Sequence, residues 1–357
     1  MRPCLTASVL LPWVMLSLLA GPSPATAGES LTLEGLKDAL RLTPEEIDAL
    51  RNGEILQRSS EETSRKELSL TLVVVLSHPH DDVIRGIRDE ISLRADASVI
   101  AFRELPEGEP RAEDFKEAVF GPDDGDEIRA LADVKPGSAF NLSAEEIAGF
   151  QALRREHPGP CDREPGCTAA FNRAWSTMLL ERMKAYRACG LAGIADYDRG
   201  GDVARPAEEL RGALEALEPF GRQMPAFYRA VLDYPRSPLA GIETSFYWRK
   251  GKVQKRPTFS LAHRMALETS EGYIAVERTF YVQRSFNSLQ RAAAVFPLDG
   301  TRTICFYNGR TSTDQVDGFG SAMRHSIGRR MMFDRLRNNV EDLRKQLDAE
   351  ATATSTP

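Results

Sequence analysis

The sequence predicts an α+β fold in which a curved antiparallel β-sheet packs on one long carboxy-terminal helix. Hydrophobic residues alternate with a period of two in five consecutive stretches after Gly241, which indicates strands. Near the end of the chain they recur every three or four residues, which indicates a helix. Between these strands and an earlier pair, residues 105–238 have the texture of helices separated by proline and glycine turns.

The amino terminus has the three regions of a secretory signal peptide over residues 1–27. Arg2 precedes an apolar run over residues 9–20, and the small residues 25–27 precede Gly28. The apolar run is shorter than the roughly 20 residues that a membrane helix requires, so we expect cleavage. The mature chain is therefore expected in the periplasm or outside the cell, with no integral membrane segment.

Composition and charge narrow the class of protein. Of the 357 residues, 42% are hydrophobic, which is typical of a globular chain. The formal net charge of −6 argues against a general affinity for nucleic acid, which favours basic proteins.

Cys161 and Cys167 are the candidate disulfide of the mature chain. They flank the turn sequence DREPG, and an oxidising compartment favours their pairing. Free buried thiols are the alternative. Their spacing is not one that zinc sites use, so no metal site is expected here.

The first elements after the signal are an arm and a pair of strands. Residues 28–66 are expected to form a helical arm, in which Thr43 caps a helix that begins at Pro44. Residues 67–76 alternate and then become apolar on both faces, as in a strand. A short helix over residues 81–93 and a strand over residues 98–104 follow.

The helical insertion over residues 105–238 contains two well-marked helices. Ser143 and Glu146 form a capping box for the first. The second runs over residues 168–189 and ends at Gly190. Its apolar stripe, which includes Trp175, is expected to be core, with a ligand groove as the alternative.

The strands and helix that complete the sheet domain lie within residues 239–349. Turn residues such as Gly251 and Gly272 separate the strands, so consecutive antiparallel pairing is expected. Residues 350–357 are expected to be a disordered tail. The five strands are predicted over residues 242–249, 257–268, 272–283, 287–296 and 301–308.

The order of these elements resembles that of the START-like superfamily, which has the helix-grip (SRPBCC) fold. A strand, a short helix and a strand precede a run of antiparallel strands and a long last helix. The resemblance covers residues 67–104 and 239–349 and includes the stretch LTLVVVLSHPHDDVIRGIRDE. It implies a lipid-like ligand in an apolar space between the sheet and the last helix. Relative to this pattern, residues 105–238 are an insertion.

His263 is the most informative position for such a cavity. It shares one face of its strand with Phe259, Leu261, Met265 and Leu267. A polar group among apolar neighbours is either an anchor for a ligand or a core histidine with hydrogen-bond partners in the protein.

Arg278 is the second candidate, because it shares a face of the next strand with Val276 and Phe280. Glu277 is expected on the opposite face with Tyr281. A buried arginine requires a partner, which is either a carboxylate or the acidic head group of a ligand. The full set of candidate ligand-binding residues is His263, Arg278, Phe259, Met265, Trp248 and Tyr281.

The string VVVLSHPHDDV resembles the HPDDE signature of zinc-dependent de-N-acetylases. In that family the histidine and second aspartate bind zinc and the first aspartate is the base, which corresponds to His78, Asp82 and Asp81. Here His80 is inserted, Val83 replaces the glutamate, and no later HxxH pair follows. No metal, cofactor or catalytic residue is therefore predicted.

We expect an exported protein that binds a hydrophobic or amphipathic, lipid-like small molecule between the sheet and the last helix. One alternative is a structural or interaction protein of the cell envelope, with residues 105–238 as the docking surface. A metal-dependent hydrolase is the third hypothesis.

Overall fold

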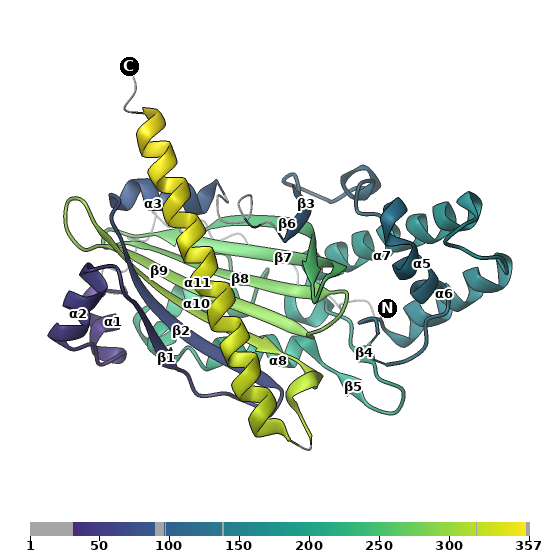
Figure 1. Ribbon diagram of the computed structural model, residues 1–357, viewed down its shortest axis with the longest axis horizontal. Coiled ribbons are helices and arrows are strands. Elements are labelled where there is room, and N and C mark those ends of the chain that lie inside the picture. Colours follow the sequence, from purple (N-terminus) through teal and green to yellow (C-terminus); the bar gives the residue numbers. More distant parts are fainter. Residues whose placement is uncertain (1–30, 90–95, 97, 138, 319, 355–357) are drawn as a thin grey trace, which may run out of the picture.

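The computed structural model describes residues 31–89, 96, 98–137, 139–318 and 320–354. The signal peptide predicted over residues 1–27 lies outside them. The core of the fold is an open, eight-stranded antiparallel sheet with helices on both faces (Figure 1). The strands are ordered β1-β2-β10-β9-β8-β7-β6-β3 across the sheet. The predicted α+β class, with a large antiparallel sheet and a long last helix, is confirmed.

The strands of the main sheet occupy both ends of the described chain. They are β1 (Ile55–Ser59), β2 (Glu67–Leu76), β3 (Val99–Glu104), β6 (Glu243–Val253), β7 (Arg256–Glu268), β8 (Tyr273–Val282), β9 (Ser288–Pro297) and β10 (Thr303–Ser312). A second, two-stranded sheet pairs β4 (Tyr197–Asp198) with β5 (Val203–Ala204). The five strands predicted after Gly241 form one consecutive antiparallel run, and β2 and β3 border that run on either side.

Most of the helices lie between β3 and β6, where the sequence predicts them. The helices are α1 (Leu33–Ala39), α2 (Pro44–Arg51), α3 (His80–Arg88), α5 (Gly125–Ala132), α6 (Ala144–Glu156), α7 (Pro165–Cys189), α8 (Pro206–Glu215), α9 (Glu218–Gln223), α10 (Pro225–Leu232) and α11 (Ser321–Thr354). The capping boxes of α2 and α6 form as predicted. Gly190 ends α7 with φ 58°, and a side chain there would collide with the carbonyl oxygen of Tyr234.

The amino-terminal arm and the end of the last helix differ from the sequence prediction, and several other elements begin or end a few residues from their predicted bounds. The arm predicted as helical contains β1, which pairs with β2. This strand is short, lies at the edge of the sheet and carries polar Gln57 and Arg58, so its apolar alternation is weak. The last helix continues to Thr354, beyond the end predicted at residue 349. Ala351 and Ala353 favour helix, and residues 355–357 lie outside the described part.

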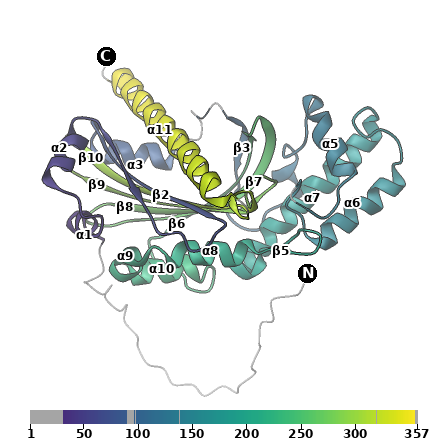
Figure 2. The same cartoon turned by 60° about the horizontal axis from the view of Figure 1, so that its bottom comes forward.

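The two faces of the sheet carry separate layers of helices. Helices α8, α9 and α10 lie on one face and α11 crosses the other (Figure 2). Helix α7 packs Trp175 against Phe259 of β7 and Tyr281 of β8, on the same side as α8. On the other side, Val83 of α3 and Leu347 of α11 pack with Val295 of β9. We call these the helical-insertion face and the α11 face.

Candidate functional site

Two adjoining hollows lie between the sheet and α11. The α11 cavity has a volume of about 240 Å³ and lies under the carboxy-terminal half of the helix, beside α3. The α11 groove, of about 440 Å³, lies under its amino-terminal half. Residues 105–238 line neither, because they pack on the opposite face. The two hollows meet at Arg249, Arg291, Tyr307, Arg335 and Leu336.

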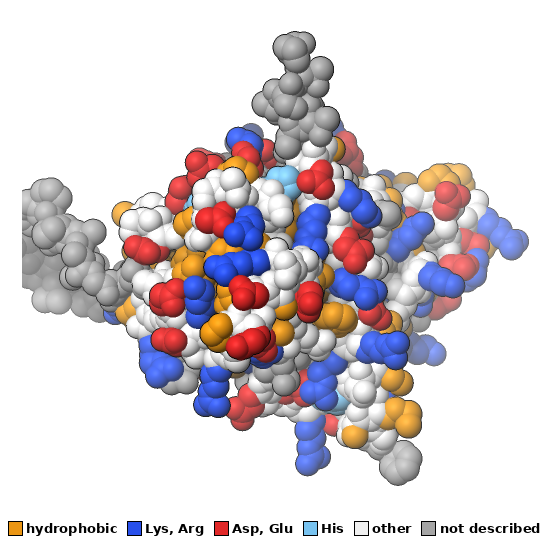
Figure 3. All heavy atoms as spheres, turned by 60° about the vertical axis from the view of Figure 1, so that its left-hand side comes forward, with side chains coloured by type: hydrophobic (Ala, Val, Ile, Leu, Met, Phe, Trp, Pro, Cys, Tyr) orange, Lys and Arg blue, Asp and Glu red, His pale blue; other side chains and the backbone are white. Residues whose placement is uncertain are grey.

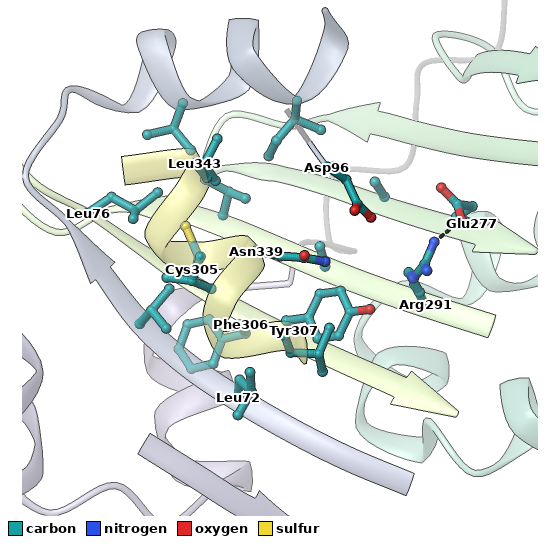
Figure 4. Close-up of a pocket in the computed structure, with 18 of the residues that line it drawn as sticks. Leu72, Leu76, Asp96, Glu277, Arg291, Cys305, Phe306, Tyr307, Asn339 and Leu343 are labelled. Atoms are coloured by element: carbon teal, nitrogen blue, oxygen red, sulfur yellow. Dashed lines mark hydrogen bonds and ion pairs between the residues drawn. The ribbon is translucent and has the colours of Figure 1, made fainter. Parts of the chain in front are cut away.

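One end of the α11 cavity is apolar. Ala275 of β8 and Ala293 of β9 are directly opposite each other in the ladder, and both line it. Because alanine has the smallest side chain that a strand can point at a helix, this pair leaves space beneath α11. The other walls are apolar side chains from β2, α3, β9, β10 and α11: Leu72, Val74, Leu76, Val83, Ile87, Val295, Phe306, Leu336, Val340 and Leu343 (Figure 4).

The other end of the cavity is charged. Glu277 and Arg291 are opposite each other on β8 and β9 and form an ion pair (Figure 4). The second carboxylate oxygen of Glu277 accepts a hydrogen bond from the hydroxyl group of Tyr247. Burial raises the pKa of Glu277, but the positive charges of Arg291 and Arg249 lower that pKa by more, so its net shift is downward. Glu277 is therefore an ionised group with both oxygens engaged.

Arg249 of β6 lies at the junction of the cavity and the groove, and its half-buried side chain lines both. Within the part of the chain that the structure describes, it has neither an ion pair nor a side-chain hydrogen bond. Burial, followed by repulsion from Arg291, lowers the pKa of Arg249. The charge of Glu277 offsets this effect only in part, because that carboxylate is already paired with Arg291. The guanidinium group of Arg249 therefore has no carboxylate bound directly to it.

Polar contacts hold α11 over these hollows. Arg335 of α11 lies 3.4 Å from the Asp96 carboxylate and donates a hydrogen bond of 3.0 Å to Ser98. His325 lies between two acceptors, with Nδ1 3.0 Å from Glu62 and Nε2 2.9 Å from the carbonyl oxygen of Arg65. His325 and Arg335 therefore attach the amino-terminal half of α11 to the residues that precede β2 and β3.

The carboxy-terminal half of α11 is attached to β2 and to the residues that follow it. Arg344 donates a hydrogen bond of 3.0 Å to the carbonyl oxygen of Val75. His78 lies 3.1 Å from the Asp348 carboxylate. The helix therefore has polar attachments at each end and the hollows between them.

The six candidate ligand-binding residues from the sequence share one buried face, but it is the helical-insertion face. They line neither the α11 cavity nor the α11 groove, so the expectation that they face the last helix is wrong. Alternation groups residues by face without saying which layer covers each face. All are at most 1% exposed: Trp248, Phe259, His263, Met265, Arg278 and Tyr281.

A β-bulge explains why Tyr281 joins this group. The register of β7 and β8 shifts between Leu261 and Ala262, so that Leu261 is opposite Tyr281 and Ala262 is opposite Thr279. The extra residue on β8 moves Tyr281 to the face opposite to that of Glu277. Simple alternation predicts that Tyr281 and Glu277 share a face, and the bulge makes this prediction wrong.

His263 is a fully buried core histidine with partners in the protein. The Tyr186 hydroxyl lies 3.1 Å from Nδ1 and the Thr244 hydroxyl lies 2.7 Å from Nε2. The ring also stacks on Phe246 with centroids 4.1 Å apart. Burial, with a further contribution from the charge of Arg278, lowers the pKa of His263 well below its usual value.

This environment predicts a pH-dependent stability. Below about pH 6.5, His263 is protonated in the unfolded chain but not in the native state. The free energy of unfolding should therefore fall by about 1.4 kcal/mol for each unit by which the pH is lowered. Urea unfolding at several pH values between 7 and 5 measures the slope. His263→Gln should reduce that slope by one proton relative to the wild type. Equal slopes in the two proteins would contradict the assignment.

Arg278 is opposite His263 on β7 and Gln290 on β9. Its three guanidinium nitrogens and both amide atoms of Gln290 are buried without hydrogen-bond partners. These atoms have almost no accessible surface, so no space for a ligand adjoins them. Among the described residues, no carboxylate forms an ion pair with Arg278 either. The carboxylate partner that the sequence analysis offers for Arg278 is therefore absent from the described residues.

The cysteine and aspartate motifs lie away from the hollows. The structure joins Cys161 and Cys167 by a disulfide bond at the start of α7. Asp81 is highly exposed, and Asp82 pairs with Arg85 one helical turn along α3. Within the described residues, no three histidine, cysteine or acidic side chains gather as metal ligands would.

The charged residues that line the hollows are not among the candidates predicted from the sequence. A usable signal was present, since the middle of each of four consecutive strands carries a charged residue. Cross-strand pairing places Arg264 opposite Glu277 and Glu277 opposite Arg291. Charged residues are almost never fully buried unless they are paired, so charges inside otherwise apolar strands indicate a shared polar site. The four residues are Arg249, Arg264, Glu277 and Arg291.

On the face drawn in Figure 3, basic and acidic side chains are interspersed with hydrophobic ones. None of the helices in the described ranges combines the length and apolarity needed to cross a bilayer.

Comparison of the chain with protein-family models, characterised proteins and solved structures finds no match.

Proposed function

We propose that this protein binds a hydrophobic or amphipathic small molecule in the α11 cavity. The observation that carries the proposal is a hollow of about 240 Å³ with walls that are mainly apolar and a charged end. Ligand sites are typically concave and apolar, with a few converging polar groups. The adjoining α11 groove of about 440 Å³ offers room for a longer molecule.

The arrangement of elements supports a helix-grip protein of START-like type. Strand β2, helix α3 and strand β3 precede five consecutive antiparallel strands and a long helix that covers the sheet. The hollow lies between the sheet and that helix, where such proteins hold their ligands. Fold alone does not define function, so the proposal depends on the hollow. With the predicted signal peptide, binding would occur in the periplasm or outside the cell.

A variant with a filled cavity tests this function. Ala293→Phe places a large side chain into the α11 cavity from β9 and should weaken the binding of the neutral fluorescent probe Nile red at least tenfold, about 1.4 kcal/mol. Fluorescence titration measures the affinity, and urea unfolding confirms that the variant is folded. Organic extracts of the wild-type protein, analysed by mass spectrometry, should contain a co-purifying amphiphile.

Ala292→Phe is the matched control, because the neighbouring residue points to the helical-insertion face. It should bind Nile red as the wild type does. A wild-type protein that binds no apolar probe, or an Ala293→Phe variant that binds it with unchanged affinity, would refute the proposed function.

A further inference from the structure

The charged end of the α11 cavity contains more positive than negative side chains. Arg249, Arg264, Arg291 and Arg335 line it, against the carboxylates of Asp96 and Glu277. This imbalance occurs in a chain whose formal net charge is −6. A local excess of arginine in an acidic protein is a feature of the site and not of the composition.

Both carboxylates are already occupied. Glu277 pairs with Arg291 and accepts a hydrogen bond from Tyr247. Asp96 accepts a hydrogen bond of 2.8 Å from the backbone of Ser98 and pairs with Arg335.

Of the remaining cations, Arg264 is engaged and Arg249 is not. Arg264 donates a hydrogen bond of 2.8 Å to the carbonyl oxygen of Ile87, near the end of α3. In the described part of the chain, Arg249 has no such partner.

The unpaired guanidinium group of Arg249 indicates which chemical group of a ligand would bind there. A partly desolvated guanidinium group without a carboxylate bound directly to it is unfavourable, and its planar donors match the oxygens of a carboxylate or phosphate. Unlike Arg278, whose nitrogens adjoin no space, Arg249 faces both hollows, so there is room for such a group.

We propose that the ligand is an anionic amphiphile, with its acidic head group on Arg249 and its hydrocarbon chain along the apolar wall of β2, β9 and α11. This inference rests on the proposed function and defines the ligand class. The head group lies at the junction of the two hollows, so the chain extends into the α11 cavity past Ala275 and Ala293. Arg291 remains paired with Glu277 and fixes the floor of the site.

Amphiphiles with the same chain and different head groups test the charge preference. Dodecanoate, dodecanol and dodecyltrimethylammonium are each used to displace Nile red from the full-length mature protein, below their micellar concentrations. Dodecanoate should bind about tenfold to a hundredfold more tightly than dodecanol, and the cation most weakly. Equal affinity for dodecanoate and dodecanol would overturn the anionic assignment and leave the proposed function standing.

Arg249→Met isolates the residue, because methionine keeps much of the apolar stem and removes the charge. Dodecanoate affinity should fall to that of dodecanol, and dodecanol affinity should not change. Arg236→Met makes the same change in net charge at a highly exposed side chain and should alter neither. A parallel loss for both amphiphiles in Arg249→Met, with unchanged unfolding, would contradict the role of Arg249 as a head-group ligand.

Two further outcomes distinguish a failure of this inference from a failure of the proposed function. Inorganic phosphate, an anion without a chain, should not displace Nile red; displacement equal to that by dodecanoate would show a free-anion site and overturn the amphiphile. If neither Nile red nor dodecanol binds, the proposed function itself fails and this inference fails with it.

Discussion

Glu127→Ala should lower the free energy of unfolding by about 3–5 kcal/mol, because it leaves a buried cation without its carboxylate. Glu127 of α5 is 2% exposed and forms ion pairs with Arg284 and Arg256. It also accepts a hydrogen bond from Gln283. Burial already lowers the pKa of Arg284 to about 10, so removal of the neighbouring negative charge makes its environment still less favourable. Urea unfolding followed by circular dichroism measures the loss.

Asp126→Ala is the matched control for this prediction. Asp126 is the preceding residue of α5, its side chain is 87% exposed, and it pairs with Arg129 on the surface. Exposed pairs of this kind contribute about 0–1 kcal/mol, so the control should unfold nearly as the wild type does. Similar losses in the two variants would show that Glu127 has no special role in joining α5 to the sheet.

Trp175→Ala should lower the free energy of unfolding by a similar amount, about 3–5 kcal/mol, because it creates a void in the core. Trp175 is fully buried in the middle of α7. Its ring lies 5.1 Å from that of Phe120 and 5.7 Å from that of Phe259. Truncation removes contacts to both the helical insertion and the sheet and leaves a large void at their junction. Thermal unfolding, read as the shift in Tm, checks the prediction.

Two variants define the cause of that loss. Thr177→Ala changes an exposed position on the same helix and should leave Tm within a few degrees of the wild type. Trp175→Phe should cost less than Trp175→Ala, because phenylalanine refills part of the void and removes an indole N–H that has no hydrogen-bond partner. A Trp175→Ala protein as stable as Thr177→Ala would show that α7 does not organise this core.

The strands and long helices were predictable because their sequence signals are local. Strand β2 has the predicted bounds, residues 67–76, and the capping box of Ser143 and Glu146 begins α6 as expected. Strand β1 was missed because an edge strand can be short and polar. Alternation also fails at the β8 bulge, since an extra residue reverses the face of Tyr281.

The position of the candidate site was less predictable than the presence of a hollow. His263 and Arg249 are both polar residues on buried strands, and alternation treats their faces alike. What separates them is the layer that covers each face, which depends on where residues 105–238 fold. The pairing of Ala275 with Ala293 could not be predicted from the sequence either, because it depends on the register of β8 and β9.

The pairing of β2 with β10 has a consequence for biosynthesis. Strand β2 is buried along its whole length, yet its partner β10 and the covering helix α11 are made last. During translation the apolar edge of β2 that pairs with β10 therefore remains unpaired until most of the chain has been synthesised. Such an edge favours aggregation and the long-range pairing slows folding, so we expect the newly made chain to require chaperone protection.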